Sequence, residues 1–295
     1  MLPDATAVGP AAIDIASVVL RALGFIALLQ AAGTALFLAL LGNRLVLATP
    51  AVERQGRVSA WHALPLLVAW QLLLAARMGG DLASVLDPAM QRLALAGSAG
   101  VANLLRVASL LLVVVALRPG TAWRTAGFVG ATLLAGSFLL TGHTTVGAHH
   151  LLLAPLLLLH LWVVAFWLGS LLPLLVVTLR EPAVVTGLVA SAFSRLAGWL
   201  VPCIALAGGL LAWALLPGWA ALRTPYGMLL VAKACGYSLL MALAALNRWR
   251  LAPAVASGEP LAARRFSAVL VAEYLVLCGV LAATATMTGL FSPEP

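Results

Sequence analysis

Charged residues are few in this chain. Asp, Glu, Lys and Arg make up only 9% of its 295 residues, whereas 63% are hydrophobic and the mean hydropathy is +1.10. A soluble domain carries roughly 25% charged residues, so this composition excludes a soluble globular protein. Most side chains must therefore face lipid or other buried helices.

Cysteine and lysine are also scarce. The three cysteines include no Cys-x-x-Cys pair, which excludes a disulfide framework and a thiolate zinc site. Lys233 is the only lysine among the 17 basic residues. The net charge of +8 is spread singly between apolar runs, so we expect no nucleic-acid-binding patch and no nucleic-acid partner.

Apolar runs of membrane-spanning length recur along the chain. A helix needs about 20 mostly apolar residues to cross the hydrocarbon of a bilayer. The sequence predicts an all-α, polytopic membrane helical bundle in contact with lipid, with about eight transmembrane helices. The predicted spans are residues 14–42, 60–79, 101–117, 125–142, 149–178, 190–216, 226–247 and 267–290.

The arginines between these spans predict the orientation. The loops after the first, third, fifth and seventh spans contain Arg44, Arg54 and Arg57, then Arg118 and Arg124, then Arg180, and then Arg248, Arg250, Arg264 and Arg265. Positively charged loops stay in the cytoplasm, so both termini are predicted to be periplasmic. The loops are too short for a separate catalytic domain and no ATP-binding motif is present, so we expect no enzymatic activity and no catalytic residue.

Histidine is concentrated in one part of the chain. His143, His149 and His150 surround the loop between the fourth and fifth spans, and His160 lies inside the fifth. His143 can fold back towards His149 or His150, whereas His160 lies about 16 Å further along the helix and belongs to a second site. Imidazole suits copper, zinc, iron and nickel, so we predict these four histidines as metal ligands. Hydrogen bonding at the interface or between helices is the alternative.

The methionines and cysteines, whose sulfur atoms are softer ligands, are not concentrated in one segment as the histidines are. Met78, Met90, Met228 and Met287 map to outer loops or outer helix ends, and only Met241 is deep on the inner side. Cys203, Cys235 and Cys278 lie near the centres of three consecutive spans. Thioether and thiolate sulfur suit Cu(I), but both residue types also pack well in helix interfaces. The sequence leaves both readings open.

Several polar residues fall at membrane depth, where they are costly and need partners. Glu273 could pair with Arg195, and its carboxylate could neutralise a metal ion or carry a proton. Gln30 and Gln71 are expected to bridge helices. Arg21 and Arg106 are expected to extend towards the outer surface.

An ordered series of residues runs from the fourth span to the end of the chain. It comprises Gly142-His143, His160, Trp167-Leu168-Gly169, Leu172-Pro173, Phe193-Ser194-Arg195-Leu196-Ala197, Pro225-Tyr226-Gly227, Lys233, Asn247-Arg248, Pro253, Arg264-Arg265 and Glu273. By this series the chain resembles the copper resistance protein D family of bacterial integral membrane proteins.

The resemblance implies an eight-span protein of the bacterial inner membrane that serves copper resistance and homeostasis. Such a protein accepts Cu(I) or Cu(II) from a periplasmic carrier protein and moves the ion towards the cytoplasm. By this resemblance, His143 and His160 correspond to histidines of the family. The assignment of His149 and His150 as ligands is based on their spacing alone. The resemblance divides the chain into spans one to three, residues 1–120, and a copper-resistance-like domain, residues 121–295.

Two other functions remain open. Helical bundles also bind b-type haem through paired imidazoles, in membrane oxidoreductases or metal-cofactor assembly factors. His143 with His150 could form such a pair at the outer surface, whereas His160 has no partner histidine at its own depth. A structural subunit or sensor, with histidines that only anchor the interface, is the third possibility.

Overall fold

The computed structural model describes residues 10–118, 124–141, 150–216 and 218–291, and these contain helices and no strands. The α-helices are α1 (Pro10–Leu41), α2 (Thr49–Gly79), α3 (Pro88–Ala96), α4 (Ser98–Ala116), α5 (Arg124–Gly136), α6 (His150–Arg180), α7 (Ala183–Leu215), α8 (Pro225–Leu246), α9 (Ala252–Ala256) and α10 (Ala262–Leu290). Short 3-10 helices cover Gly42–Arg44, Ala83–Leu86, Ser137–Leu140 and Trp219–Arg223, and a π-helical turn, Asn247–Leu251, follows α8.

These helices confirm the predicted all-α membrane bundle. Seven of the described helical segments are long and apolar enough to cross a membrane. The predicted fourth span is the shorter apolar segment Arg124–Leu140. Large apolar side chains cover the outside, among them Trp199 and Trp213, which are 83% and 81% exposed. Such an exterior suits lipid and not water.

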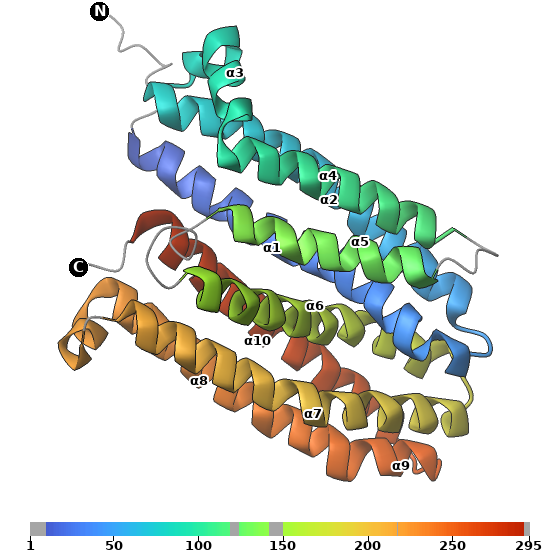
Figure 1. Cartoon of the computed structure of the whole chain (residues 1–295). Helices are drawn as coiled ribbons and strands as arrows, with labels where there is room; N and C mark the ends of the chain where they lie inside the picture. Colours follow the sequence, from blue (N-terminus) through green and yellow to red (C-terminus); the bar gives the residue numbers. More distant parts are fainter. Residues whose placement is uncertain (1–9, 119–123, 142–149, 217, 292–295) are drawn as a thin grey trace, which may run out of the picture.

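The long helices lie side by side along one common direction (Figure 1). Helix α1 packs against α2, α5, α6 and α10, and α6 also packs against α7 and α10. The start of α1 meets the end of α10, where Arg21 Nη1 donates to the carbonyl of Thr288 at 2.7 Å. The first and last helices therefore bring the two ends of the described chain to the same end of the bundle.

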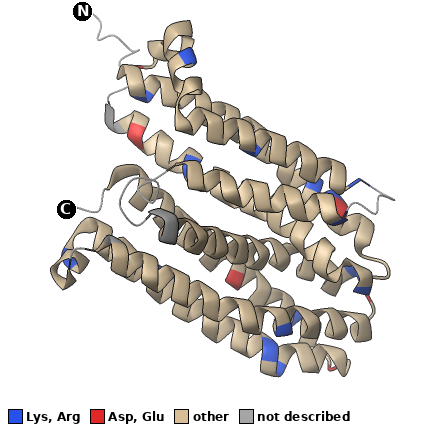
Figure 2. Cartoon of the chain, viewed as in Figure 1, with Lys and Arg blue, Asp and Glu red and all other residues tan. Residues whose placement is uncertain are grey.

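Described segments that carry or flank the loop arginines contact one another at the opposite end. The connection from α6 to α7 contacts the one from α1 to α2, because Glu181 Oε1 accepts from the backbone N–H groups of Val46, Leu47 and Ala48, each at 2.8 Å. Arg57 Nη1 donates to the carbonyl of Leu117. In Figure 2 most charged segments lie towards the ends of the helices. The cytoplasmic assignment of this end remains a prediction from the positive-inside rule.

Helices α1 and α6 cross in close contact. A Cβ on Gly169 would lie closer than 3.0 Å to backbone atoms of Gly33 and Thr34, so no side chain fits there. The Gly169 carbonyl accepts from Gln30 Nε2 and from Thr34 Oγ1, both at 3.3 Å. Small residues allow two membrane helices to approach this closely, and polar side chains fix the crossing.

The expected bridging by glutamines is confirmed. Gln30 links α1 to α6 through Gly169. Gln71 Oε1 on α2 accepts from Asn103 Nδ2 on α4 at 2.9 Å.

We expect Gly169→Ala to destabilise the protein by about 1–3 kcal/mol, because the added methyl forces the α1 backbone away. Gly279→Ala is the matched control, because a Cβ at this helical glycine meets nothing within 4 Å. The control should be neutral or slightly stabilising, since alanine favours a helix more than glycine does. Thermal unfolding in detergent compares the two variants. An equal melting temperature for both would show that the crossing is not tight.

The Glu181 carboxylate predicts how the stability of the protein depends on pH. Burial raises the pKa of this carboxyl, but the three backbone N–H donors lower it more, so the pKa lies below its usual value. A carboxyl with a lowered pKa stabilises the fold at neutral pH, and this stabilisation is lost as the pH falls through the lowered pKa. We expect the melting temperature of the wild type to fall more steeply on acidification than that of Glu181→Gln. If the melting temperatures of the two proteins fell equally on acidification, this role of Glu181 would be contradicted.

Candidate functional site

Two cavities lined by described residues lie in opposite halves of the bundle. The large cavity, about 1160 Å³, is lined by Ser17 and Arg21 near the start of α1 and by Thr288 near the end of α10. The small pocket, about 220 Å³, is lined by Phe266 near the start of α10 and by Asn247 after the end of α8. The large cavity therefore belongs to the half with the two chain ends, and the small pocket to the half with the arginine loops.

His160 on α6 lines the large cavity. Its Nδ1 is buried and has no hydrogen-bond partner among the described residues. Gly208 on α7 leaves space beside the ring, because a Cβ there would lie 3.5 Å from His160 Cε1. The alternative expected for His160, a hydrogen bond to another helix, also has support, because the ring interacts with the backbone of Ile204 on α7. An imidazole nitrogen with a free lone pair can bind a metal ion.

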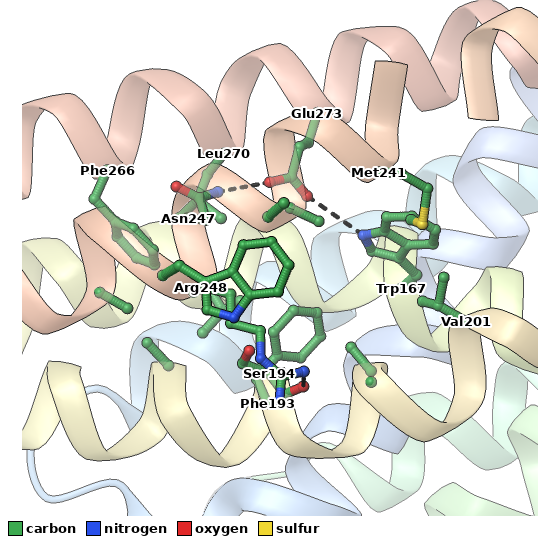
Figure 3. Close-up of a pocket in the computed structure, with 18 of the residues that line it drawn as sticks. Trp167, Phe193, Ser194, Val201, Met241, Asn247, Arg248, Phe266, Leu270 and Glu273 are labelled. Carbon is green, nitrogen blue, oxygen red and sulfur yellow. Dashed lines mark hydrogen bonds between the residues drawn. The ribbon is translucent and has the colours of Figure 1, made fainter. Parts of the chain in front are cut away.

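Glu273 on α10 lies at the small pocket and is only 2% exposed. One carboxylate oxygen accepts from Asn247 Nδ2 at 2.6 Å, and the other accepts from Trp167 Nε1 at 3.4 Å. Figure 3 shows the carboxylate between these two donors, with Met241 beside the indole. Both donors are neutral, so the carboxylate remains available to neutralise a cation or to take up a proton.

Trp167 is the residue that both cavities share. It is 3% exposed, and its N–H points to Glu273 on the side of the small pocket. Gly169, two residues further along α6, makes the close contact with α1. The tight crossing of α1 and α6 thus holds the indole between the two cavities.

The expected pair of Arg195 with Glu273 is wrong. Arg195 is exposed on α7, and the only ion pair between described residues joins Arg77 to Asp14 at 3.7 Å. The rotation of α7 points Arg195 outwards, and Asn247 takes its place at Glu273. The sequence alone does not indicate Asn247 as the partner of Glu273. The position of Asn247 in the π-helical turn is a signal available only from the structure, since such turns are frequent at functional sites.

The histidine cluster is only partly described. His143 and His149 lie outside the described residues, and His150 begins α6. Among the described residues, no group of three or more His, Cys, Asp or Glu could hold a metal ion. The assignment of His143, His149, His150 and His160 as ligands therefore stays a prediction.

The sulfur residues do not form a common site in the described part of the chain. None of the three cysteines lines either cavity, and Cys235 is exposed. Cys203 Sγ contacts the carbonyl of Trp199 in its own helix at 3.4 Å. Two methionines do line a cavity: Met287 lines the large one and Met241 the small one.

The fold and these cavities define a class of protein, a multi-pass helical membrane protein with ionisable side chains buried at membrane depth on both sides of a tryptophan. Residues 12–151 match the family described as copper resistance protein D-like, N-terminal domain, and residues 187–287 match the family copper resistance protein D. The chain belongs to the copper resistance protein D family. Comparison with curated proteins and with solved structures gives no significant match.

We expect Asn247→Ala to destabilise the protein by about 2 kcal/mol or more, because it removes the shorter hydrogen bond to a buried carboxylate. Asn43→Ala is the matched control, since Asn43 is exposed in the connection after α1. Thermal unfolding of the purified proteins measures both effects. Equal melting temperatures for Asn247→Ala and the control would contradict the importance of this network.

Proposed function

We propose that this copper resistance family protein is a copper permease of the bacterial inner membrane that moves copper from the periplasm towards the cytoplasm. The observation that carries the proposal is the placement of two buried side chains able to interact with a cation on the two sides of Trp167. His160 offers an imidazole nitrogen in the large cavity, and Glu273 offers a buried carboxylate in the small pocket. Membership in the copper resistance protein D family supports copper as the metal.

The proposed route begins at the periplasmic side. His143, His149 and His150 receive Cu(I) or Cu(II) from a periplasmic carrier protein. The ion then reaches His160 in the large cavity and passes Trp167 to the small pocket. There the carboxylate of Glu273 neutralises its charge, and the thioether of Met241 offers a soft ligand.

The membrane potential can drive this movement without an enzymatic reaction. Each elementary charge that moves inwards gains about 2.3 kcal/mol per 100 mV. Uptake down this gradient needs no nucleotide hydrolysis, which agrees with the lack of an ATP-binding motif. The protein acts in this proposal as a permease and not as an enzyme.

Haem binding is the weaker candidate. A bis-imidazole site needs two histidines at the same depth. His160 is the only histidine among the described residues that line the large cavity. His62 is exposed on α2, outside the cavity, and contacts the carbonyl of Val58 through Nδ1. A Soret absorbance in the purified protein would revive the haem interpretation.

We expect His160→Ala and Glu273→Ala each to lower cellular copper accumulation by about tenfold or more, the scale seen when groups that support a metal are removed. His62→Ala is the matched control, because its imidazole lies outside both cavities. Copper content is measured in cells with equal amounts of each protein in the membrane. Wild-type accumulation in both His160→Ala and Glu273→Ala would overturn the proposed route. His143→Ala tests the periplasmic mouth in the same assay.

A further inference from the structure

The large cavity gathers positive charge. Four cationic side chains line it, Arg21 from α1, Arg77 from α2, Arg106 from α4 and Lys233 from α8. No aspartate or glutamate is among the described residues that line it. The cavity is therefore an electropositive space inside a membrane protein.

Most of these cations have no counter-charge. Among the described residues, only Arg77 makes an ion pair, with Asp14 at 3.7 Å, and both side chains are partly exposed. Arg106 is 2% exposed and donates to two neutral groups, Asn103 Oδ1 at 2.8 Å and Ser137 Oγ at 3.1 Å. The expected extension of Arg106 towards the surface is thus wrong, and a buried guanidinium keeps its charge at this depth.

Arg21 and Lys233 likewise lack a counter-charge among the described residues. Arg21 donates to the carbonyl and the hydroxyl of Thr288, at 2.7 and 3.2 Å. No hydrogen bond or ion pair joins Lys233 to another described residue. Neutral partners satisfy hydrogen bonds but leave the net charge uncompensated.

An aromatic ring brings two of these cations together. The guanidinium carbons of Arg21 and Arg106 lie 5.2 and 5.3 Å from the centroid of the Trp70 ring. Each gains a cation–π attraction, but two like charges beside one ring repel each other. Ser17, one helical turn before Arg21, lines the same cavity, and its buried Oγ has no partner among the described residues. One hydroxyl and two guanidinium groups thus line the same cavity, and no described Asp or Glu lines it.

We propose that the large cavity binds a phosphate-type oxyanion at Arg21, Arg106 and Ser17. Arginine pairs well with phosphate because its planar N–H groups match the oxyanion. The walls of the cavity are largely apolar, with Phe25, Leu73 and Leu277 among the lining residues. These walls suit an acyl chain, so the headgroup of an anionic phospholipid is the source that the cavity favours over free phosphate.

A bound anion would change the electrostatic potential that a metal ion meets in the cavity. Uncompensated arginines in this cavity oppose the approach of any metal cation to His160. A bound oxyanion offsets that repulsion. Anion binding itself does not depend on copper, so it can be tested without the metal.

The test uses the full-length protein, purified in detergent and stripped of lipid, in the absence of copper. Phosphatidylglycerol, phosphatidylcholine and inorganic phosphate are added separately. Native mass spectrometry measures the retained lipid, and thermal unfolding measures stabilisation by each probe. Arg106→Gln and Arg21→Gln remove one cation each. Arg264→Gln is the control, an exposed arginine at the start of α10 that lines neither cavity.

We expect phosphatidylglycerol to be retained and to raise the melting temperature of the wild type and of Arg264→Gln. Arg106→Gln and Arg21→Gln should each bind it at least about tenfold more weakly, a loss of about 1.4 kcal/mol. Stabilisation by inorganic phosphate with the same dependence on the arginines, without retained lipid, would identify free phosphate as the source. If Arg106→Gln does not fold, the binding measured for Arg21→Gln decides the test, because the Arg21 side chain is only partly buried. Binding of both probes that ignores the arginines, or no binding of either, overturns the proposal.

Discussion

The contact between Gly33 and Gly169 is the constraint on which the rest of the bundle depends. It brings the backbones of α1 and α6 together and so joins the helices that match the N-terminal family domain to those that precede the copper resistance protein D match. Gln30 and Thr34 fix the crossing through the Gly169 carbonyl. Because Trp167 lies only two residues away on α6, the position of its indole follows from the same contact.

This position places the buried indole between two cavities of the bundle. Trp167 borders a large cavity on the side of the chain ends and a small pocket on the side of the arginine loops. Its N–H donates to Glu273, which ties the partition to the carboxylate in the small pocket. A displacement of the indole would remove a hydrogen bond from that carboxylate. In the proposed permease, passage of the ion past Trp167 is linked to the state of Glu273 through this hydrogen bond.

Much of the fold could be predicted from the sequence, because run length and hydropathy decide whether a helix can span a membrane. The grouping of the arginine loops and the bridging by Gln30 and Gln71 follow from the same physics. The partners of buried charges could not be predicted, because they depend on how each helix is rotated about its axis. Rotation of α7 leaves Arg195 exposed, and the π-helical turn after α8 brings Asn247 to Glu273. Likewise, the burial of Arg106 depends on Asn103 and Ser137, which lie on two different elements.

The most direct measurement is the accessibility of the two cavities from the two sides of the membrane. Thr284→Cys places a thiol in the large cavity and Ala245→Cys one in the small pocket, each in a background without Cys203, Cys235 and Cys278. A membrane-impermeant thiol reagent is applied to spheroplasts and to inside-out vesicles. We expect Thr284→Cys to react only from the periplasmic side and Ala245→Cys only from the cytoplasmic side. Reaction of both cysteines from the same side would contradict a partition at Trp167.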